Sequence, residues 1–179
     1  MLDAEGFDGL TMRALALRVG INPMTIYHHF KDRDGLIKAV AEWTYADVTA
    51  LTTGGPLQRV HSLLTAYYAK VVTHPALTLA IFGRPGIFPD QARRITSQLI
   101  SYLRELSIPP KLALRWAHIL VDYTHGAGLA VAAKYGNTSC SPEAAPPDDF
   151  ADGLAALLKA FSGSRDGQDR GPQAEVPSI

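Results

Sequence analysis

The stretch from residue 9 to residue 30 constrains the fold most, because helix start and stop signals alternate closely within it. Thr11 is a residue type that caps helix N-termini, and Gly20 can take the left-handed conformation that ends a helix. Asn22 followed by Pro23 marks a second start, since proline fits the first helical position. The pattern predicts two short helices around a tight turn, which is the plan of a helix-turn-helix unit.

The second of these helices, expected over residues 24–30, carries side chains suited to a DNA duplex. A helix that reads DNA enters the major groove and is braced from behind, so its outward groups must reach bases and phosphates. Residues 9–33 hold four Lys or Arg and one Asp, whereas the whole chain has net charge zero, and this local excess suits a phosphate-facing surface. An ordinary pair of packed helices with solvated polar side chains is the alternative interpretation. The outward residues are expected to be Thr25, Tyr27, His28 and His29.

Four motifs in this region resemble the DNA-binding domain of tetracycline-repressor (TetR) family regulators. They are G-F-x-G-L-T-x-R at 6–13, A-x-x-x-G-[VI] at 16–21, T-[IL]-Y-x-H-F at 25–30 and K-x-[KR]-x-x-L at 31–36. The resemblance implies an all-α fold with a helix-turn-helix domain at 1–50 and a helical effector-binding and dimerisation domain at 56–161. The residues expected to contact DNA are Thr11, Arg13, Pro23, Met24, Thr25, Tyr27, His28, His29, Lys31 and Arg33.

The start of the chain departs from the family pattern. The family usually has a longer first helix behind the helix-turn-helix, and only residues 1–5 precede the Gly6-Phe7 step here. A start codon assigned too far downstream or a clipped domain would each account for this. We expect part of an apolar face to be left uncovered, at a cost of about 25 cal/mol per Å² left in water, and hence a less stable head with weaker DNA binding. That face would comprise Leu10, Ala14, Leu17 and Ile26.

Beyond the head, apolar residues recur at helical spacing between Gly- and Pro-containing breaks. Residues 33–50 are expected to form one long helix that joins the two domains and ends at a flexible joint at 52–56. The tail at 162–179 has little apolar content and is expected to be disordered. Further helices are expected over residues 57–72, 76–82, 90–106, 112–135 and 150–161.

The second domain carries no catalytic signature. No G-x-S-x-G elbow, phosphate loop or dinucleotide fingerprint is present, so we expect neither an enzyme nor a cofactor. His118, Asp122 and His125 share a helix face, but no His-x3-His pair occurs; we expect no metal, with a metal or polar-ligand site as the alternative. Aromatic and polar side chains here would suit a plain core, or the small-molecule pocket that the resemblance implies. The expected lining is Tyr67, Tyr68, His74, Phe82, Phe88, Trp116, His118, Asp122 and Tyr123.

Small residues in the second half of the 112–135 helix, including Gly126 and Gly128, would allow a partner helix to approach closely, and we expect a homodimer. No apolar run approaches the ~20 residues that span a bilayer, and the single cysteine, Cys140, suits a reducing compartment, so a cytoplasmic protein without membrane contact is expected. The resemblance implies a dimeric repressor that a small-molecule inducer releases from a (pseudo)palindromic double-stranded operator. The alternative is a ligand-binding or interaction protein whose shortened head is impaired in DNA binding.

Overall fold

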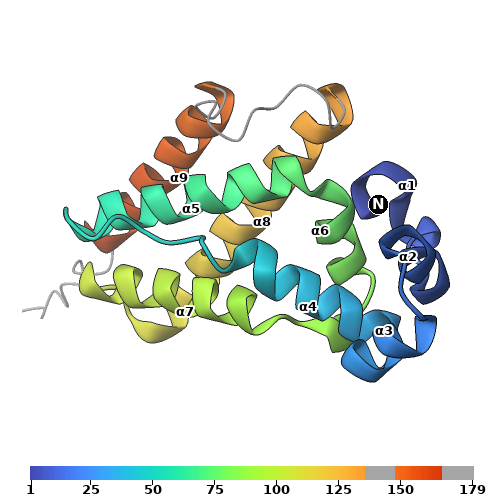
Figure 1. The fold of residues 1–179 in the computed structure, drawn as a ribbon. Helices are drawn as coiled ribbons and strands as arrows, with labels where there is room; N and C mark the ends of the chain where they lie inside the picture. Colours follow the sequence, from blue (N-terminus) through green and yellow to red (C-terminus); the bar gives the residue numbers. More distant parts are fainter. Residues whose placement is uncertain (136–147, 167–179) are drawn as a thin grey trace, which may run out of the picture.

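The computed structural model describes residues 1–135 and 148–166, and the expected all-α fold is confirmed (Figure 1). Within these residues no strand occurs. The elements are α1 Leu2–Gly9, α2 Met12–Val19, α3 Pro23–Phe30, α4 Arg33–Tyr45, α5 Pro56–Thr73, α6 Pro75–Phe82, the 3-10 helix η1 Pro85–Ile87, α7 Asp90–Glu105, α8 Pro110–Tyr135 and α9 Asp148–Asp166.

The helices form a small N-terminal head and a larger body. Helices α1 to α3 lie at one end of the molecule, and α4 leads from them into the body (Figure 1). In the body, α8 packs against both α5 and α7, and α9 packs on α8. The head also touches the body directly, because α1 packs against α6.

The predicted start and stop signals of the two short helices in the head are confirmed. Thr11 Oγ1 accepts from the Ala14 N–H at 3.0 Å, and Asn22 Oδ1 accepts from the Met24 N–H at 2.9 Å. Gly20 ends α2 with φ 75° and ψ 29°, a left-handed conformation that favours glycine. These local hydrogen bonds fix where both short helices begin and end.

One apolar core runs through head and body. It includes Leu10 and Ile26 in the head, Ile37 in α4, and Leu64 and Leu120 in the body, all of them buried. Because α4 contributes to both ends of this core, it is packed along its length and does not hang as a free linker. The division into domains at residues 51–55 stays a prediction.

Helix α4 is shorter than the sequence predicted. It ends at Tyr45 and does not continue to residue 50. Arg94 Nη2 donates to the Tyr45 carbonyl at 3.2 Å and to the Val48 carbonyl at 2.8 Å. A side chain from α7 therefore binds backbone groups at this helix end, a contact that the sequence pattern does not reveal.

The C-terminal end also differs from the expectation. Helix α9 continues to Asp166, so the first residues of the predicted tail at 162–179 are helical. Residues 167–179 lie outside the described residues, as does Cys140. None of the described helices is long and apolar enough to cross a membrane.

The apolar face of the head that we expected to be partly uncovered is buried at some of its positions and exposed at another. Leu10 and Ile26 are only 5% and 3% exposed, so the expectation is wrong for these two residues. Helix α1 breaks at Gly6, where φ is 69° and ψ is −175°, and packs against α6. Leu17, which we grouped on the same face, is 85% exposed because it points outward from α2.

Candidate DNA-reading head and ligand cavity

Helix α3 is braced from behind by α2. Ile26 on its inner side packs in the core that also holds Met12 and Ala16 of α2. Pro23 occupies the first turn of α3, and the Lys31 N–H closes its far end on the Tyr27 carbonyl at 2.8 Å. The helix is thus fixed at both termini and along its inner face, as a reading helix requires.

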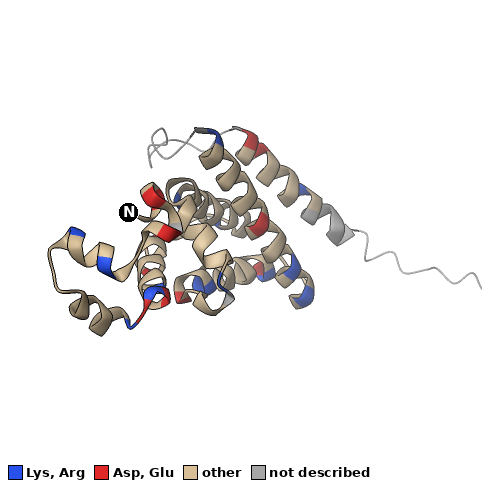
Figure 2. Ribbon diagram, turned by 90° about the vertical axis from the view of Figure 1, so that its right-hand side faces the viewer, with Lys and Arg blue, Asp and Glu red and all other residues tan. Residues whose placement is uncertain are grey.

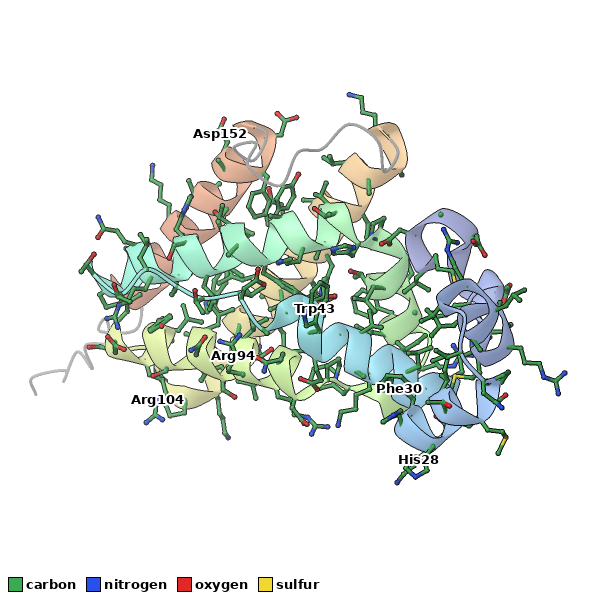
Figure 3. The ribbon with its side chains drawn as sticks, in the orientation of Figure 1. His28, Phe30, Trp43, Arg94, Arg104 and Asp152 are labelled. Atoms are coloured by element: carbon green, nitrogen blue, oxygen red, sulfur yellow. The ribbon has the colours of Figure 1, made fainter. Side chains whose placement is uncertain are left out.

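The predicted outward residues of α3 all lie at the surface. Tyr27 is 40% exposed, and Met24 is more exposed still. The His28 side chain projects away from the body (Figure 3), and its ring meets the His29 ring edge-on with centroids 5.7 Å apart. The exposed set on this helix is Pro23, Met24, Thr25, Tyr27, His28 and His29.

Basic residues flank α3 but are absent from it (Figure 2). Arg13 and Lys31 are exposed, and Arg33 is half-buried at the start of α4. The Thr11 hydroxyl accepts a capping bond, so its own proton is left for a phosphate oxygen. Arg18 is engaged elsewhere, since its Nη1 lies 2.9 Å from Glu5 Oε1.

Leu17 is a surface residue that the sequence interpretation missed. It lies four positions after Arg13 on α2, and residues at that spacing share one helix face. If Arg13 faces a phosphate, Leu17 lies beside it. That spacing was the signal that could have placed Leu17 outside.

A cavity of about 280 Å³ lies in the body between α4, α5, α6, α7 and α8. Apolar and aromatic side chains make up most of its wall, which is typical of small-molecule pockets. The lining residues are Tyr45, Tyr67, Thr78, Ile81, Phe82, Phe88, Ala92, Ile95, Thr96, Val121 and His125.

Three of the nine predicted pocket residues line this cavity: Tyr67, Phe82 and Phe88. The other six belong elsewhere. Tyr68 stacks on Phe150 of α9 with ring centroids 4.0 Å apart, and the Tyr123 hydroxyl donates to the Asp149 and Phe150 carbonyls at 3.2 Å.

The remaining corrections concern α6 and α8. His74 Nδ1 lies 2.9 Å from Asp3 Oδ2, at the contact between body and head. Trp116 is half-buried, while His118 and Asp122 are exposed. Helix α8 contributes Val121 and His125, four residues apart, to the cavity wall, whereas His118 and Asp122 are not among the lining residues.

Two hydrogen-bonded residues supply the main polar feature of the cavity. Tyr67 Oη lies 2.5 Å from His125 Nε2, and the Phe82 ring meets the His125 ring edge-on. Burial lowers the pKa of His125 to about 4, against a smaller opposing effect of Asp122. Burial also raises the pKa of Tyr67, so both side chains are uncharged at neutral pH.

The described residues offer few ligands for a metal site. Among residues 1–135 and 148–166, no three His, Cys, Asp or Glu side chains are grouped to hold a metal ion. His125, the imidazole of the cavity, is bonded to a phenol, and its wall contains no carboxylate.

The small residues of α8 divide between two faces. Gly128 is buried against α5, where an added Cβ would lie 2.7 Å from Val71 Cγ1. Gly128 therefore allows close packing within the chain. We had expected it to allow a helix of a second copy to approach, and this expectation is wrong for Gly128. Gly126 has nothing within 4 Å of an added Cβ and lies exposed, on one face with Ala130 and Ala133.

Comparison with known proteins relates the head to a family. Residues 1–40 match the family described as bacterial regulatory proteins, tetR family. Over 112 residues the chain is 28% identical to the HTH-type transcriptional repressor KstR2 of two Mycobacterium tuberculosis strains, covering 59% of this chain and 52% of the relative. The chain thus spans about half the length of the curated relatives it matches.

Solved structures share the fold along most of the chain. Mycobacterium smegmatis BioQ matches with a TM-score of 0.72 at 21% identity over 90% of this chain and 91% of that chain, and BioQ has also been solved with its double-stranded DNA operator. ActR of Streptomyces coelicolor in complex with actinorhodin matches with a TM-score of 0.74 at 18% identity over 91% of both chains. At these identities the likeness establishes the fold.

Proposed function

We propose that this chain, which belongs to the TetR family of bacterial regulators as its N-terminal motifs predicted, is a ligand-responsive transcriptional repressor. It binds operator DNA as a homodimer and leaves the operator when a small molecule occupies its cavity. The observation that carries the proposal is the outward face of α3, which is exposed, contains no Lys, Arg, Asp or Glu, is braced at Ile26 and is flanked by Lys and Arg residues.

In this proposal α3 enters the major groove. Thr25, Tyr27 and His29 reach base edges or nearby phosphates, because their hydroxyl, phenol and imidazole groups can donate and accept. Basic and hydroxyl groups around the helix bind phosphates and set its register on the duplex. These phosphate-binding residues are Thr11, Arg13, Lys31 and Arg33.

The homodimer places two such heads on one operator. The exposed face of α8 that carries Gly126, Ala130 and Ala133 is smooth enough for a second copy to approach closely. Exposed Ala155 and Ala156 extend a similar surface on α9. Four helices, two from each copy, would then make the interface.

Release by the ligand follows from the position of the cavity. Tyr45, the last residue of α4, lies in its wall together with residues of α6 and α7. At its other end α4 follows closely on α3. Helix α6 packs against α1, and His74, the residue before α6, lies within hydrogen-bond distance of Asp3 in α1. A ligand that favours another arrangement of α4 and α6 would change the separation of the two heads from the ~34–36 Å that successive major grooves require.

The test begins with DNA selected from a random pool by the purified full chain at low salt. Affinity for the selected duplex is then measured by fluorescence anisotropy for the wild type, Tyr27→Phe and Tyr27→Ala. We expect Tyr27→Ala to bind at least tenfold more weakly, with Tyr27→Phe between the two, while thermal unfolding stays unchanged. Failure to enrich any duplex, or equal binding by all three proteins, would contradict the proposal.

A further inference from the structure

The wall of the cavity shows which chemical class of molecule it can accept. None of its lining residues is an Asp, Glu, Lys or Arg. His125, its basic side chain, is neutral at physiological pH and already bonded to Tyr67. A charged ligand would have to leave water without meeting an opposite charge, which is strongly unfavourable.

The shape of the wall favours a compact ring. Four aromatic side chains, Tyr45, Tyr67, Phe82 and Phe88, surround the space, and Ile81, Ile95 and Val121 fill in between them. The volume of about 280 Å³ lies just below the range of ~300–1,000 Å³ typical of small-molecule sites. One or two fused rings would fit better than a nucleotide or a long acyl chain.

The Tyr45 hydroxyl is a donor that this fold leaves unsatisfied. The residue is 1% exposed, and its hydroxyl oxygen is buried without a hydrogen-bond partner among the described residues. Thr78 and Tyr67 lie close enough to oppose the rise that burial causes in the pKa of Tyr45, but neither meets the geometry of a hydrogen bond with its hydroxyl oxygen. A buried polar group of this kind destabilises the fold unless a partner is supplied.

The hydroxyl groups of the two threonines in the cavity wall, unlike that of Tyr45, already donate hydrogen bonds. Thr96 Oγ1 donates to the Ala92 carbonyl at 3.0 Å, and Thr78 Oγ1 donates to the His74 carbonyl at 3.4 Å. Their protons are used within their own helices, so they offer only lone pairs to a guest. An oxygen that accepts from Tyr45 and, as a hydroxyl, can also donate to a threonine would satisfy both kinds of group.

We propose that the effector is an uncharged one- or two-ring compound bearing a neutral oxygen that accepts a hydrogen bond from the Tyr45 hydroxyl. This inference rests on the proposed function in so far as the cavity is the effector site. It excludes carboxylates, phosphates and amines of the same size. Tyr45 is its specificity-determining residue.

The experiment uses a matched set on one ring system, with the full chain and calorimetry in the absence of DNA. The probes are 2-naphthol and 2-acetonaphthone as neutral oxygen compounds, naphthalene without oxygen, 2-naphthoate as an anion and 2-naphthylmethylamine as a cation. We expect the oxygen compounds to bind about tenfold more tightly than naphthalene, and the ions to bind at least a hundredfold more weakly than 2-naphthol.

Tyr45→Phe isolates the hydroxyl, and Tyr102→Phe on α7, away from the cavity, is the matched control. We expect Tyr45→Phe to lose about tenfold in affinity for 2-naphthol and to keep its affinity for naphthalene, while Tyr102→Phe changes neither. A generally damaged cavity would lower both affinities alike. Equal binding of 2-naphthoate and 2-naphthol, equal losses for both probes in Tyr45→Phe, or no binding by either oxygen compound would overturn the inference.

The same ligands separate this inference from the proposed function. If 2-naphthol binds through Tyr45 but leaves the affinity for the selected duplex unchanged, the chemistry of the cavity stands and release by the ligand fails. If the duplex is released by 2-naphthoate alone, release stands and the inference fails.

Discussion

Glu42 and Arg94 exchange caps between α4 and α7. The carboxylate of Glu42 accepts from the Asp90 N–H at 2.5 Å and from the Gln91 N–H at 3.0 Å, at the first turn of α7. Arg94, one turn into α7, donates to the carbonyls of Tyr45 and Val48 at the end of α4 (Figure 3). A negative side chain thus meets a helix N-terminus and a positive side chain meets a C-terminus, the arrangement that helix dipoles favour. The two helices are held together beside the cavity.

Glu42→Ala should lower the free energy of unfolding by about 1 kcal/mol, since it removes the partner of two N–H groups at a helix start. The free energy of unfolding of Glu42→Gln should lie between those of Glu42→Ala and the wild type, because glutamine keeps an acceptor but loses the charge. Urea unfolding at one protein concentration measures both, with Asp152→Asn on the surface of α9 as the control. A Glu42→Ala protein as stable as the wild type would show that the α4–α7 contact does not depend on this carboxylate.

Gly128→Ala should destabilise the fold by about 1–2 kcal/mol. Alanine gains up to ~1 kcal/mol in helix propensity, but its Cβ would overlap the stiff Val71 side chain, and overpacking costs about 1–3 kcal/mol. In a Val71→Ala background, where the overlapping methyl groups are gone, Gly128→Ala should lower the free energy of unfolding less than it does in the wild type. Denaturant unfolding of the two single variants and the double variant tests this coupling, and strict additivity would argue against it.

Gly126→Ala is the companion change on the open face of α8. Nothing lies within 4 Å of the added Cβ in the chain, so within one subunit it should be stabilising by up to ~1 kcal/mol. At the proposed dimer interface the same methyl would meet the second copy. Sedimentation should then show a weaker dimer for Gly126→Ala, and a dimer of unchanged affinity would place the interface elsewhere.

Lys31→Gln should weaken binding to all DNA sequences alike and reduce the slope of log K against log salt by about 0.9, the value for one phosphate contact. Glutamine keeps a side chain of similar length on a backbone with φ 63°, so the conformational strain at this position is comparable. Titrations of one duplex at several salt concentrations give the slope. Lys111→Gln, exposed at the start of α8, is the control and should leave it unchanged.

His125 should make the protein less stable as the pH falls. Its pKa is about 4 in the fold, against 6.5 as the ordinary value, so between these pH values the unfolded chain binds a proton that the folded chain does not. Stability is therefore complete above about pH 6.5 and decreases towards pH 4, by about 2–3 kcal/mol from this residue. His125→Gln should remove that part of the pH dependence in urea unfolding between pH 4.5 and 7. A parallel pH profile for variant and wild type would contradict the assignment.

Local signals in the sequence predicted the head well. Thr11, Gly20 and Asn22 each act on backbone groups only a few residues away, so their roles can be inferred without knowing the fold. The rotation of α2 about its axis could not be inferred as safely, because apolar residues occur on both of its faces. Because of that ambiguity we grouped Leu17 on one apolar face with Leu10 and Ile26, which are buried, whereas Leu17 is exposed.

The cavity was harder to predict because neighbouring residues on one helix serve different purposes. Tyr67 lines it, whereas Tyr68, the next residue, stacks on Phe150 of α9. Helix α5 is covered on several sides, so its apolar pattern does not tell which neighbour each aromatic ring meets. Tyr45 was missed altogether, since it lies at the end of a helix that the sequence extended to residue 50.

Trp43 lies on α4 two residues before Tyr45, whose carbonyl accepts from Arg94, and it is 81% exposed (Figure 3). The second tryptophan of the chain, Trp116, is half-buried on α8. An aqueous quencher such as acrylamide will therefore reach the indole of Trp43 first, and that emission can be separated from the signal of the shielded indole. The chain carries an intrinsic optical probe on the helix that leads from the cavity to the head, so a displacement of α4 can be followed in unlabelled protein.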